Sequence, residues 1–199
     1  VVIIPDHYIF TADSKSNRNV DLLRDFVKEQ GITHFYDVID DPNGAWKYDV
    51  SRGPLVRQFG SGYAGVCHSA HPQKGHTRPG EVLFGTDSHT CTAGAFNEFA
   101  TGIGNTDAGF VLGTGKLLLK VPETMHFRLE GHLQPGVMAK DVVLHVIGEV
   151  GFDGATYRAM QFDGPGAAGL SMDDRMTIAN MAIEAGGKNG IFEFDTQTA

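Results

Sequence analysis

The stretch Glu81-Val-Leu-Phe-Gly-Thr-Asp-Ser-His89 is the part of the sequence that says most about the fold. Its first half is apolar and predicts a short strand over 81–84, while its second half contains the polar cluster Asp87-Ser88-His89. Ligands of α/β proteins gather at the carboxyl ends of parallel strands. A polar cluster directly after an apolar run therefore indicates both a strand and a candidate site.

Two further polar clusters follow apolar residues. Asp6-His7 comes after the run 1–4, and Cys67-His68, with His71 nearby, comes after Gly65-Val66. If all three clusters lie at strand ends, they are expected to share one cleft. The residues alone support equally well an alternative in which each cluster is an ordinary exposed loop.

The rest of the sequence predicts strands that alternate with helices. Strands are expected over 1–4, 33–36, 81–84 and 125–129 and from 191, and helices over 19–30, 93–102, 106–116, 139–150 and 172–185. Gly31 is expected to end the first helix, and Ser171 with Asp174 predicts a capping box at the start of the last one. This alternation is typical of an α/β fold with a largely parallel sheet.

Composition excludes several classes of protein. The net charge of −8 and the absence of a Lys/Arg cluster argue against nucleic acid as the main partner, and no apolar run reaches the ~18 residues of a membrane helix. Two cysteines in 199 residues are no disulfide framework. Glycine, at 26 residues, is nearly twice as frequent as the usual ~7% and indicates many tight turns.

Common catalytic templates do not fit. Gly113-Thr-Gly-Lys116 lacks the first glycine and the final Ser/Thr of a phosphate loop, and Ser88 lacks the glycines of a hydrolase elbow. A zinc site at Cys67, His68 and His71 is disfavoured because no fourth ligand and no Cys-x-x-Cys is evident. Asn180 and Glu184, four residues apart, project from one helix face, which by itself indicates only a solvated surface.

The stretch Gly85-Thr-Asp-Ser-His-Thr-Cys-Thr-Ala-Gly-Ala-Phe96, followed by Ala100-Thr-Gly-Ile-Gly-Asn-Thr-Asp107, resembles the aconitase superfamily, and most of all its isopropylmalate dehydratase branch. Supporting segments are Ile4-Pro-Asp-His7, Gly65-Val-Cys-His68, Pro79-Gly-Glu-Val82, Gly113-Thr-Gly-Lys116 and Glu184-Ala-Gly-Gly-Lys-Asn-Gly190. These segments occur in the same order as in the family, and they cover nearly the whole chain except about residues 41–62. The resemblance implies a three-layer α/β/α iron–sulfur domain, of which residues 1–199 form a partial N-terminal piece, with 41–62 as a loop insertion.

The resemblance also implies an activity. Enzymes of this branch interconvert 2- and 3-isopropylmalate by dehydration and rehydration, in leucine biosynthesis; homoaconitase, aconitase and a cluster-free RNA-binding relative are the alternatives. An iron of a [4Fe-4S] cluster acts as Lewis acid on the substrate hydroxyl, and histidine–carboxylate pairs handle protons. Either bacterial cytoplasm or plastid stroma is expected as the compartment.

Residue roles follow from the resemblance, position by position. Asp6 and His7 match the pair that protonates the leaving hydroxyl; His68 would pair with Asp87, and His89 with Glu184, near the iron-bound water. Ser88 matches a serine that binds a substrate carboxylate, and Asn180 matches an asparagine near the cluster. The glycines around 85–104 and 186–187 would let the backbone approach a small anionic di- or tricarboxylate.

Two parts of the family's machinery have no match in these residues. Cys67 and Cys91 are not at the positions of the three cluster-binding cysteines, which are expected downstream of Ala199, so both are interpreted as packing residues. The serine base lies on a swivelling domain, which in this branch is a separate small subunit. The piece alone is therefore expected to hold no cluster and to be inactive.

Overall fold

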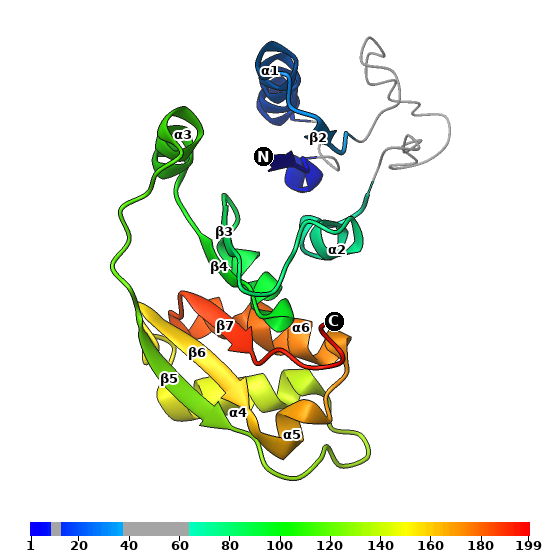
Figure 1. The fold of residues 1–199 in the computed structure, drawn as a ribbon, viewed down its shortest axis with the longest axis vertical. Coiled ribbons are helices and arrows are strands. Elements are labelled where there is room, and N and C mark those ends of the chain that lie inside the picture. The colour runs from blue at the N-terminus through cyan, green and yellow to red at the C-terminus, as the bar shows by residue number, and fades with distance from the viewer. Residues whose placement is uncertain (9–12, 38–63) are drawn as a thin grey trace. The chain divides into compact units, whose positions relative to one another are not determined.

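Residues 1–8, 13–37 and 64–199 are described by a computed structural model, in which the chain divides into two units, Val1–His76 and Thr77–Ala199 (Figure 1). The loop expected over 41–62 lies outside the described residues. Within the described part, none of the helices combines the length and the apolar character needed to cross a membrane. We describe the two units in turn.

The first unit contains a pair of short parallel strands. Strand β1 (Val2–Ile3) pairs with β2 (His34–Phe35), and helix α1 (Ser14–Gln30) connects them. A 3-10 turn, η1 (Asp6–Tyr8), follows β1. Helix α2 (Cys67–Gln73), which the sequence did not predict, completes the unit.

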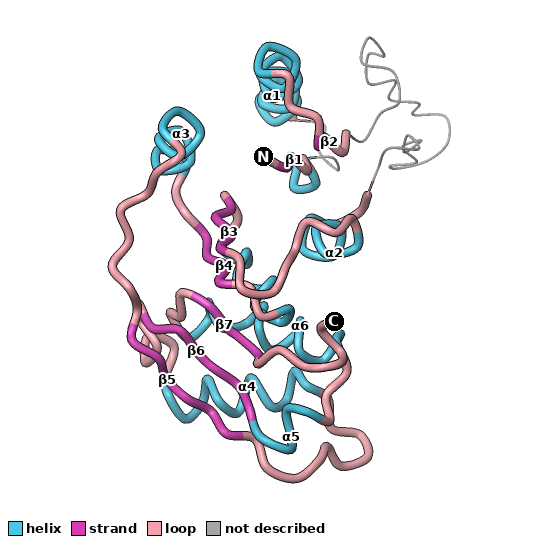
Figure 2. The backbone as a smooth tube through the Cα atoms, viewed as in Figure 1, coloured by secondary structure: helices cyan, strands magenta, loops and turns pink. Residues whose placement is uncertain are grey.

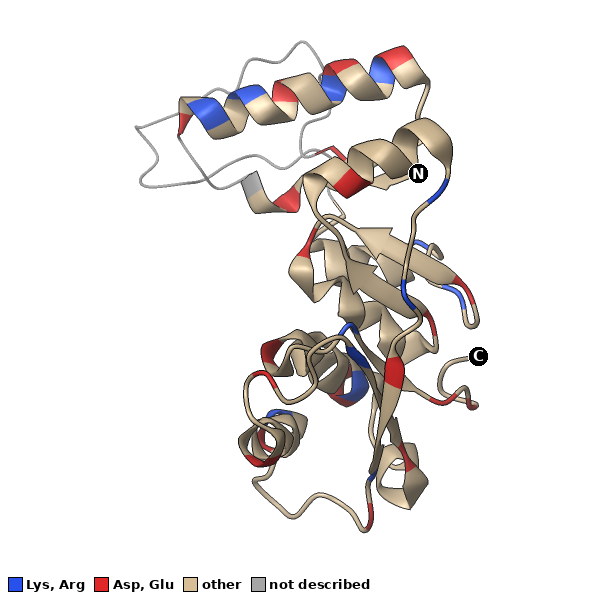
Figure 3. Cartoon of the chain, turned by 90° about the vertical axis from the view of Figure 1, so that its left-hand side faces the viewer, with Lys and Arg blue, Asp and Glu red and all other residues tan. Residues whose placement is uncertain are grey.

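Helix α1 is amphipathic, with charges of both signs interleaved along its exposed length (Figure 3). The predicted end at Gly31 is confirmed, because Gly31 adopts the left-handed conformation (φ 60°) and its N–H caps the last turn. The predicted start at residue 19 is wrong. The side chain of Asp13 accepts a hydrogen bond from the Ser16 N–H at 2.8 Å, so the helix begins five residues earlier, at Ser14.

In the second unit, strands β3 (Val82–Gly85) and β4 (Phe99–Gly102) form a parallel pair. The segment between them is η3 (Ser88–Phe96), a 3-10 helix. The helix predicted over 93–102 is therefore wrong, since the small residues at its start belong to η3 and its second half pairs with β3 as a strand. Helix α3 (Asn105–Thr114) follows, close to the predicted range.

A three-stranded parallel sheet, in the order β5-β6-β7, forms the rest of this unit (Figure 2). Its elements are β5 (Glu123–Arg128), α4 (Ala139–Val150), β6 (Arg158–Asp163), α5 (Gly164–Ala168), α6 (Met172–Asn180), η4 (Met181–Ala185) and β7 (Asn189–Phe192). All strand pairs of the described residues are parallel, which confirms the predicted α/β class.

The core of this unit lies between the three-stranded sheet and helices α4 and α6. Phe127, Phe162 and Phe192 stack on successive strands, with ring centroids 5.2 and 5.3 Å apart. Val143 from α4 and Ile178 from α6 are fully buried against the same cluster. Burial of such side chains contributes about 1.5–3 kcal/mol each, so this packing fixes the position of α6.

The last predicted helix, 172–185, has the right ends but not one continuous form. The capping box is confirmed: Ser171 Oγ accepts from the Asp174 N–H at 3.2 Å, and the Asp174 carboxylate accepts from the Ser171 N–H at 3.1 Å. The α-helix then stops at Asn180, and the chain continues as 3-10 turns to Gly186, whose φ of 82° ends it. This change of pitch decides where Glu184 points.

Candidate functional site

The second unit positions Asp87, Ser88 and His89 directly after β3, as the sequence predicted. Asp87 is the N-cap of η3, and its Oδ1 accepts a hydrogen bond from the His89 N–H at 2.8 Å. The backbone of His89 takes φ −85° and ψ 15°, a sparsely populated conformation. The polar cluster is thus held in a fixed turn rather than an open loop.

Two threonines explain why this segment forms a 3-10 helix. Thr90 Oγ1 donates to the Asp87 carbonyl and Thr92 Oγ1 donates to the His89 carbonyl, each at 2.6 Å. Both bonds reach back three residues, which is the spacing of a 3-10 turn. Thr90 and Thr92 are buried. Their role was not predicted from the sequence, although threonine at two alternate positions after Ser88 is a recognisable signal.

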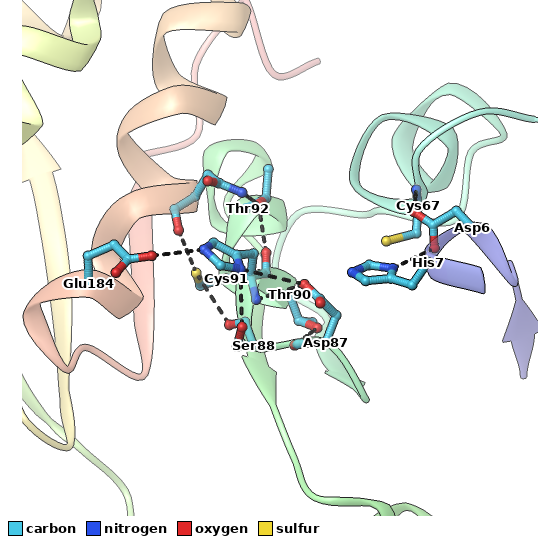
Figure 4. Close-up of polar contacts among 11 residues, drawn as sticks. Asp6, His7, Cys67, Asp87, Ser88, Thr90, Cys91, Thr92 and Glu184 are labelled. Carbon is cyan, nitrogen blue, oxygen red and sulfur yellow. Dashed lines mark hydrogen bonds and ion pairs between the residues drawn. The ribbon is translucent and has the colours of Figure 1, made fainter. Parts of the chain in front are cut away.

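His89 lies between a hydroxyl and a carboxylate that hold both of its ring nitrogens. Its Nε2 is 3.1 Å from Glu184 Oε1, 95 residues away, and its Nδ1 is 3.1 Å from Ser88 Oγ (Figure 4). Since the carboxylate can only accept, Nε2 carries the proton in the neutral ring and Nδ1 accepts from the serine. The expected His89–Glu184 pair is therefore confirmed in geometry. A carboxylate that fixes one tautomer of an imidazole prepares it for proton transfer.

Asn180 and Glu184 both point toward η3. Asn180 Nδ2 donates to Thr92 Oγ1 at 2.9 Å, while Glu184 reaches His89 from the 3-10 turns of η4. Both side chains project to the same side, as expected. The expected reason, a spacing of four residues on one helix, is wrong, because the α-helix ends between them. The interpretation as a solvated helix face is also wrong for Asn180.

Cys91 is a packing residue, as expected. It is 1% exposed, and its thiol donates to the Asn180 carbonyl at a sulfur–oxygen distance of 3.4 Å. Burial raises the pKa of this thiol to about 12, so it stays protonated. Cys67, the other cysteine of the sequence, belongs to the other unit. An iron–sulfur cluster needs several thiolate ligands, and these residues do not fit one.

A cleft of about 340 Å³ opens beside Ser88. Its lining combines hydroxyl-bearing residues, glycine backbone, two isoleucines and one lysine: Thr86, Ser88, Thr101, Gly102, Ile103, Gly104, Ile183, Gly186, Gly187 and Lys188. Donors of this kind suit a carboxylate. Lys188 was not singled out in the sequence analysis, because a lone lysine carries no signal without its neighbours in space.

The glycines around the cluster have a structural explanation. A Cβ on Gly94 would collide with the carbonyl of Gly190, and one on Gly102 would lie 2.7 Å from the Asp87 carbonyl. These glycines let η3, β4 and β7 approach one another closely. The close approach is made by the protein's own backbone, and the expected approach to a substrate stays a prediction.

The first unit contains the other expected pair. His7 Nδ1 is 2.9 Å from Asp6 Oδ1, and Asp6 Oδ2 accepts from the Cys67 N–H at 2.8 Å (Figure 4). Although burial of the Asp6 carboxyl acts to raise its pKa, the bonds from Cys67 and His7 outweigh it and lower the pKa below the usual value. Asp6 is therefore an ionised partner that orients His7.

Helix α2 carries His68 and His71. Burial, together with the neighbouring His76 and His68, lowers the pKa of His71 to about 4, so His71 is neutral at physiological pH. Cys67 and His68 begin α2, and residues 64–66 before them form no strand, so the expectation that Gly65-Val66 ends a strand is wrong. The pairing of His68 with Asp87, and the cleft shared by the three clusters, join residues of the two units and stay predictions.

Comparison with known proteins gives a consistent family. The model of the aconitase family (aconitate hydratase) matches residues 12–199. Over 198 residues the chain is 57% identical to the chloroplastic 3-isopropylmalate dehydratase large subunit of Arabidopsis thaliana. It is 48% identical to the probable 3-isopropylmalate dehydratase large subunit of Methanothermobacter thermautotrophicus and 45% identical to the large subunit of Moorella thermoacetica.

These alignments cover all of the chain but only part of each relative. The chain spans 36% of the length of the Arabidopsis protein and 42% of each of the other two. The family model therefore establishes the family for residues 12–199, a range that includes His89 and Glu184 and begins after Asp6 and His7.

Proposed function

Because the chain belongs to the aconitase family, we propose that it is part of a hydro-lyase that interconverts 2- and 3-isopropylmalate in leucine biosynthesis. The observation that carries the proposal is the His89–Glu184 pair, two residues far apart in sequence that meet at 3.1 Å beside a cleft suited to carboxylates. The names of the relatives support isopropylmalate as the substrate.

The reaction has two difficult steps, and these residues are suited to assist the second, the departure of hydroxide. The proton to be removed lies beside a carboxylate and is weakly acidic, and hydroxide is a poor leaving group that must be protonated. Asp6 holds His7 in place to protonate the departing hydroxyl. His89, oriented by Glu184, moves the proton of the water that is lost and regained. His68 with Asp87 forms a third pair in the proposal.

Substrate binding is assigned to the cleft of the second unit. The Ser88 hydroxyl would turn its single proton from His89 Nδ1 to a substrate carboxylate, and Lys188 supplies charge of the opposite sign at the same cleft. The ammonium lies 4.9 Å from the centre of the Tyr157 ring, which keeps it near the protein surface without neutralising it. Asn180 at the end of α6 is held by Thr92 of η3, and in the proposal it lies near the cluster.

Two components come from outside these residues in the proposal. The family is generally iron–sulfur dependent, and since Cys67 and Cys91 do not fit a cluster, its ligands belong to the part of the relatives that the chain does not span. The designation of the relatives as large subunits supports a small-subunit partner, which would carry the swivelling domain. The compartment is plastid stroma or bacterial cytoplasm, in line with the chloroplastic and prokaryotic relatives.

A turnover assay tests the proposal. The complete enzyme, assembled with its small subunit, is given isopropylmalate, homocitrate and citrate at equal concentrations. We expect the highest kcat/KM with isopropylmalate. A preference for citrate or homocitrate would assign the protein to the aconitase or homoaconitase branch, and no turnover of any of the three would overturn the hydro-lyase assignment itself.

A further inference from the structure

We propose that Asp6, His7 and Cys67 form a binding site for a Zn²⁺ ion in the first unit. One ligand atom from each residue, a carboxylate oxygen, a ring nitrogen and the sulfur, lies within 4.8 Å of the other two. Figure 4 shows the three side chains gathered at one place, from the turn after β1 and from the start of α2. The sequence grouped Cys67 with His68 and His71, whereas the structure groups it with Asp6 and His7.

The donor set selects zinc among the common cations. One sulfur, one nitrogen and one oxygen match the ligands that Zn²⁺ takes at three-residue sites, with water in the fourth position. Mg²⁺ and Ca²⁺ prefer oxygen ligands throughout. Zinc–ligand bonds of about 2.0–2.3 Å bring ligand atoms to roughly 3.3–3.8 Å from one another, so the three side chains need to close by only about 1 Å.

The surroundings favour binding and give the ion a path to the site. The Asp6 side chain is 8% exposed and anchored by the Cys67 N–H, so one ligand is already in place, while the His7 side chain is 55% exposed and opens the site to solution. A carboxylate oxygen of Asp6 is an ordinary ligand for Zn²⁺. The thiol of Cys67 must lose its proton to solvent when the ion binds.

Zinc at this site would compete with the proposed role of His7. Binding replaces the hydrogen bond between His7 Nδ1 and Asp6 with bonds to the metal, so His7 no longer delivers a proton. This inhibitory consequence rests on the proposed function, whereas the site itself rests only on the geometry of the three residues.

Cobalt serves as the spectroscopic probe of the site. The 199-residue chain, stripped with a chelator and kept reduced with a phosphine, is titrated with Co²⁺, whose bond to a thiolate produces a charge-transfer absorption; Zn²⁺ is then added to displace it. We expect one Co²⁺ per chain, release of about one proton and bleaching by Zn²⁺. Cys67→Ser should abolish the charge-transfer band, and Asp6→Asn or His7→Gln should weaken zinc binding by at least 10-fold.

Cys91→Ser is the matched control, since it removes the other thiol of the chain, and it should leave the band unchanged. Circular dichroism checks that each variant is folded, and Asp6→Asn and His7→Gln test the site independently of the cysteine. Absence of a thiolate band in the wild-type chain, or loss of the band in Cys91→Ser with retention in Cys67→Ser, would overturn the proposal.

Turnover of the complete enzyme tests the inhibitory role separately. Micromolar Zn²⁺ should lower the turnover of the wild-type enzyme, and a chelator should restore it. Metal binding without inhibition would keep the site and refute its link to His7. Turnover of the zinc-free enzyme tests the proposed function, and the cobalt titration tests the metal site. Failure of the metal site is therefore distinguishable from failure of the proposed function.

Discussion

The two units hold their histidine–carboxylate pairs in different ways. In the second unit His89 and Glu184 are 95 residues apart and meet because η3, η4 and β7 pack on one core. In the first unit Asp6 and His7 are neighbours in sequence, and the backbone N–H of Cys67 at the start of α2 anchors Asp6. The buried residues in the described part of the first unit are Pro5, Val20, Val27 and Ala70, far fewer than in the second unit.

This difference indicates which part of the structure fixes the geometry of each histidine–carboxylate pair. The long-range pair depends on the packing of the whole second unit, so a defect far from His89 is expected to disturb it. The local pair depends on one turn and on the start of α2, and tolerates more change elsewhere. Preorganised groups held by packing contribute most to catalysis, because they do not have to be ordered during the reaction.

The largest effect is expected from breaking the long-range pair in the complete enzyme. His89→Ala removes the proposed proton carrier and should lower kcat by about 10²-fold or more. Glu184→Gln retains a side chain of the same size and should cost less, with a shifted pH profile of kcat. Turnover with isopropylmalate, and the iron content of each preparation, measure these effects.

His145→Ala is the matched control for that experiment. His145 lies exposed on α4 in the same unit, so its removal should change kcat less than about 2-fold. Loss of iron in parallel with turnover in His89→Ala would show that the histidine supports the cluster rather than the proton transfer. Normal turnover in His89→Ala would refute its assigned role.

Local signals in the sequence were sufficient for part of the fold. The bounds 139–150 of α4 were predicted correctly, because Val142, Val143, Val146 and Ile147 form one apolar stripe. The capping box at Ser171 and the left-handed Gly31 were also found, since caps depend on one or two residues.

Tertiary packing decided the parts that the sequence could not predict. Residues 93–102 contain small residues that favour a helix, yet burial and pairing with β3 make the second half a strand. Strand β6 was missed because it is buried in an irregular pattern, without the alternation that marks a strand. The partner of His89 was found only through the family resemblance, because no local pattern connects it to Glu184.

Replacing one glycine in each unit by alanine compares how tightly the two units are packed. Gly94→Ala would place a methyl group on the carbonyl of Gly190 in β7, so η3 and β7 must separate. We expect a loss of about 3 kcal/mol in the free energy of unfolding of the chain, measured by urea denaturation. Gly31→Ala has free space around its Cβ and should cost only about 1 kcal/mol, from its left-handed backbone. Equal losses would contradict the closer packing of the second unit.

The pH dependence of stability sharpens the comparison further. Glu98, 2% exposed, lies before β4, and among the described residues its Oε2 has no hydrogen-bond partner. Burial and the charge of Glu81 raise the pKa of the Glu98 carboxyl to about 7 from its ordinary value of 4.5. The folded state therefore holds the proton more tightly than the unfolded state, and stability falls as the pH rises between these two values.

This shift corresponds to a loss of about 2 kcal/mol between pH 5 and pH 7 from this group alone. Glu98→Gln removes the titration and should raise stability relative to the wild type more at pH 7 than at pH 5. Urea denaturation at both pH values measures the difference. A stability gap between variant and wild type that does not change with pH would show that Glu98 is charged in the folded state.

The smallest effects are expected at the helix caps, where the two units provide a matched pair of substitutions. Ser171→Ala removes the acceptor for the Asp174 N–H at the start of α6 and should lower the stability of the second unit by about 1 kcal/mol. Because α6 leads into the turns that carry Glu184, amide hydrogen exchange should increase at η4 as well as at α6. Asp13→Ala removes the acceptor for the Ser16 N–H at the start of α1, and the increased exchange should stay within α1. If amide hydrogen exchange also becomes faster in η1, at Asp6, the Asp6–His7 pair of the first unit depends on long-range packing as well.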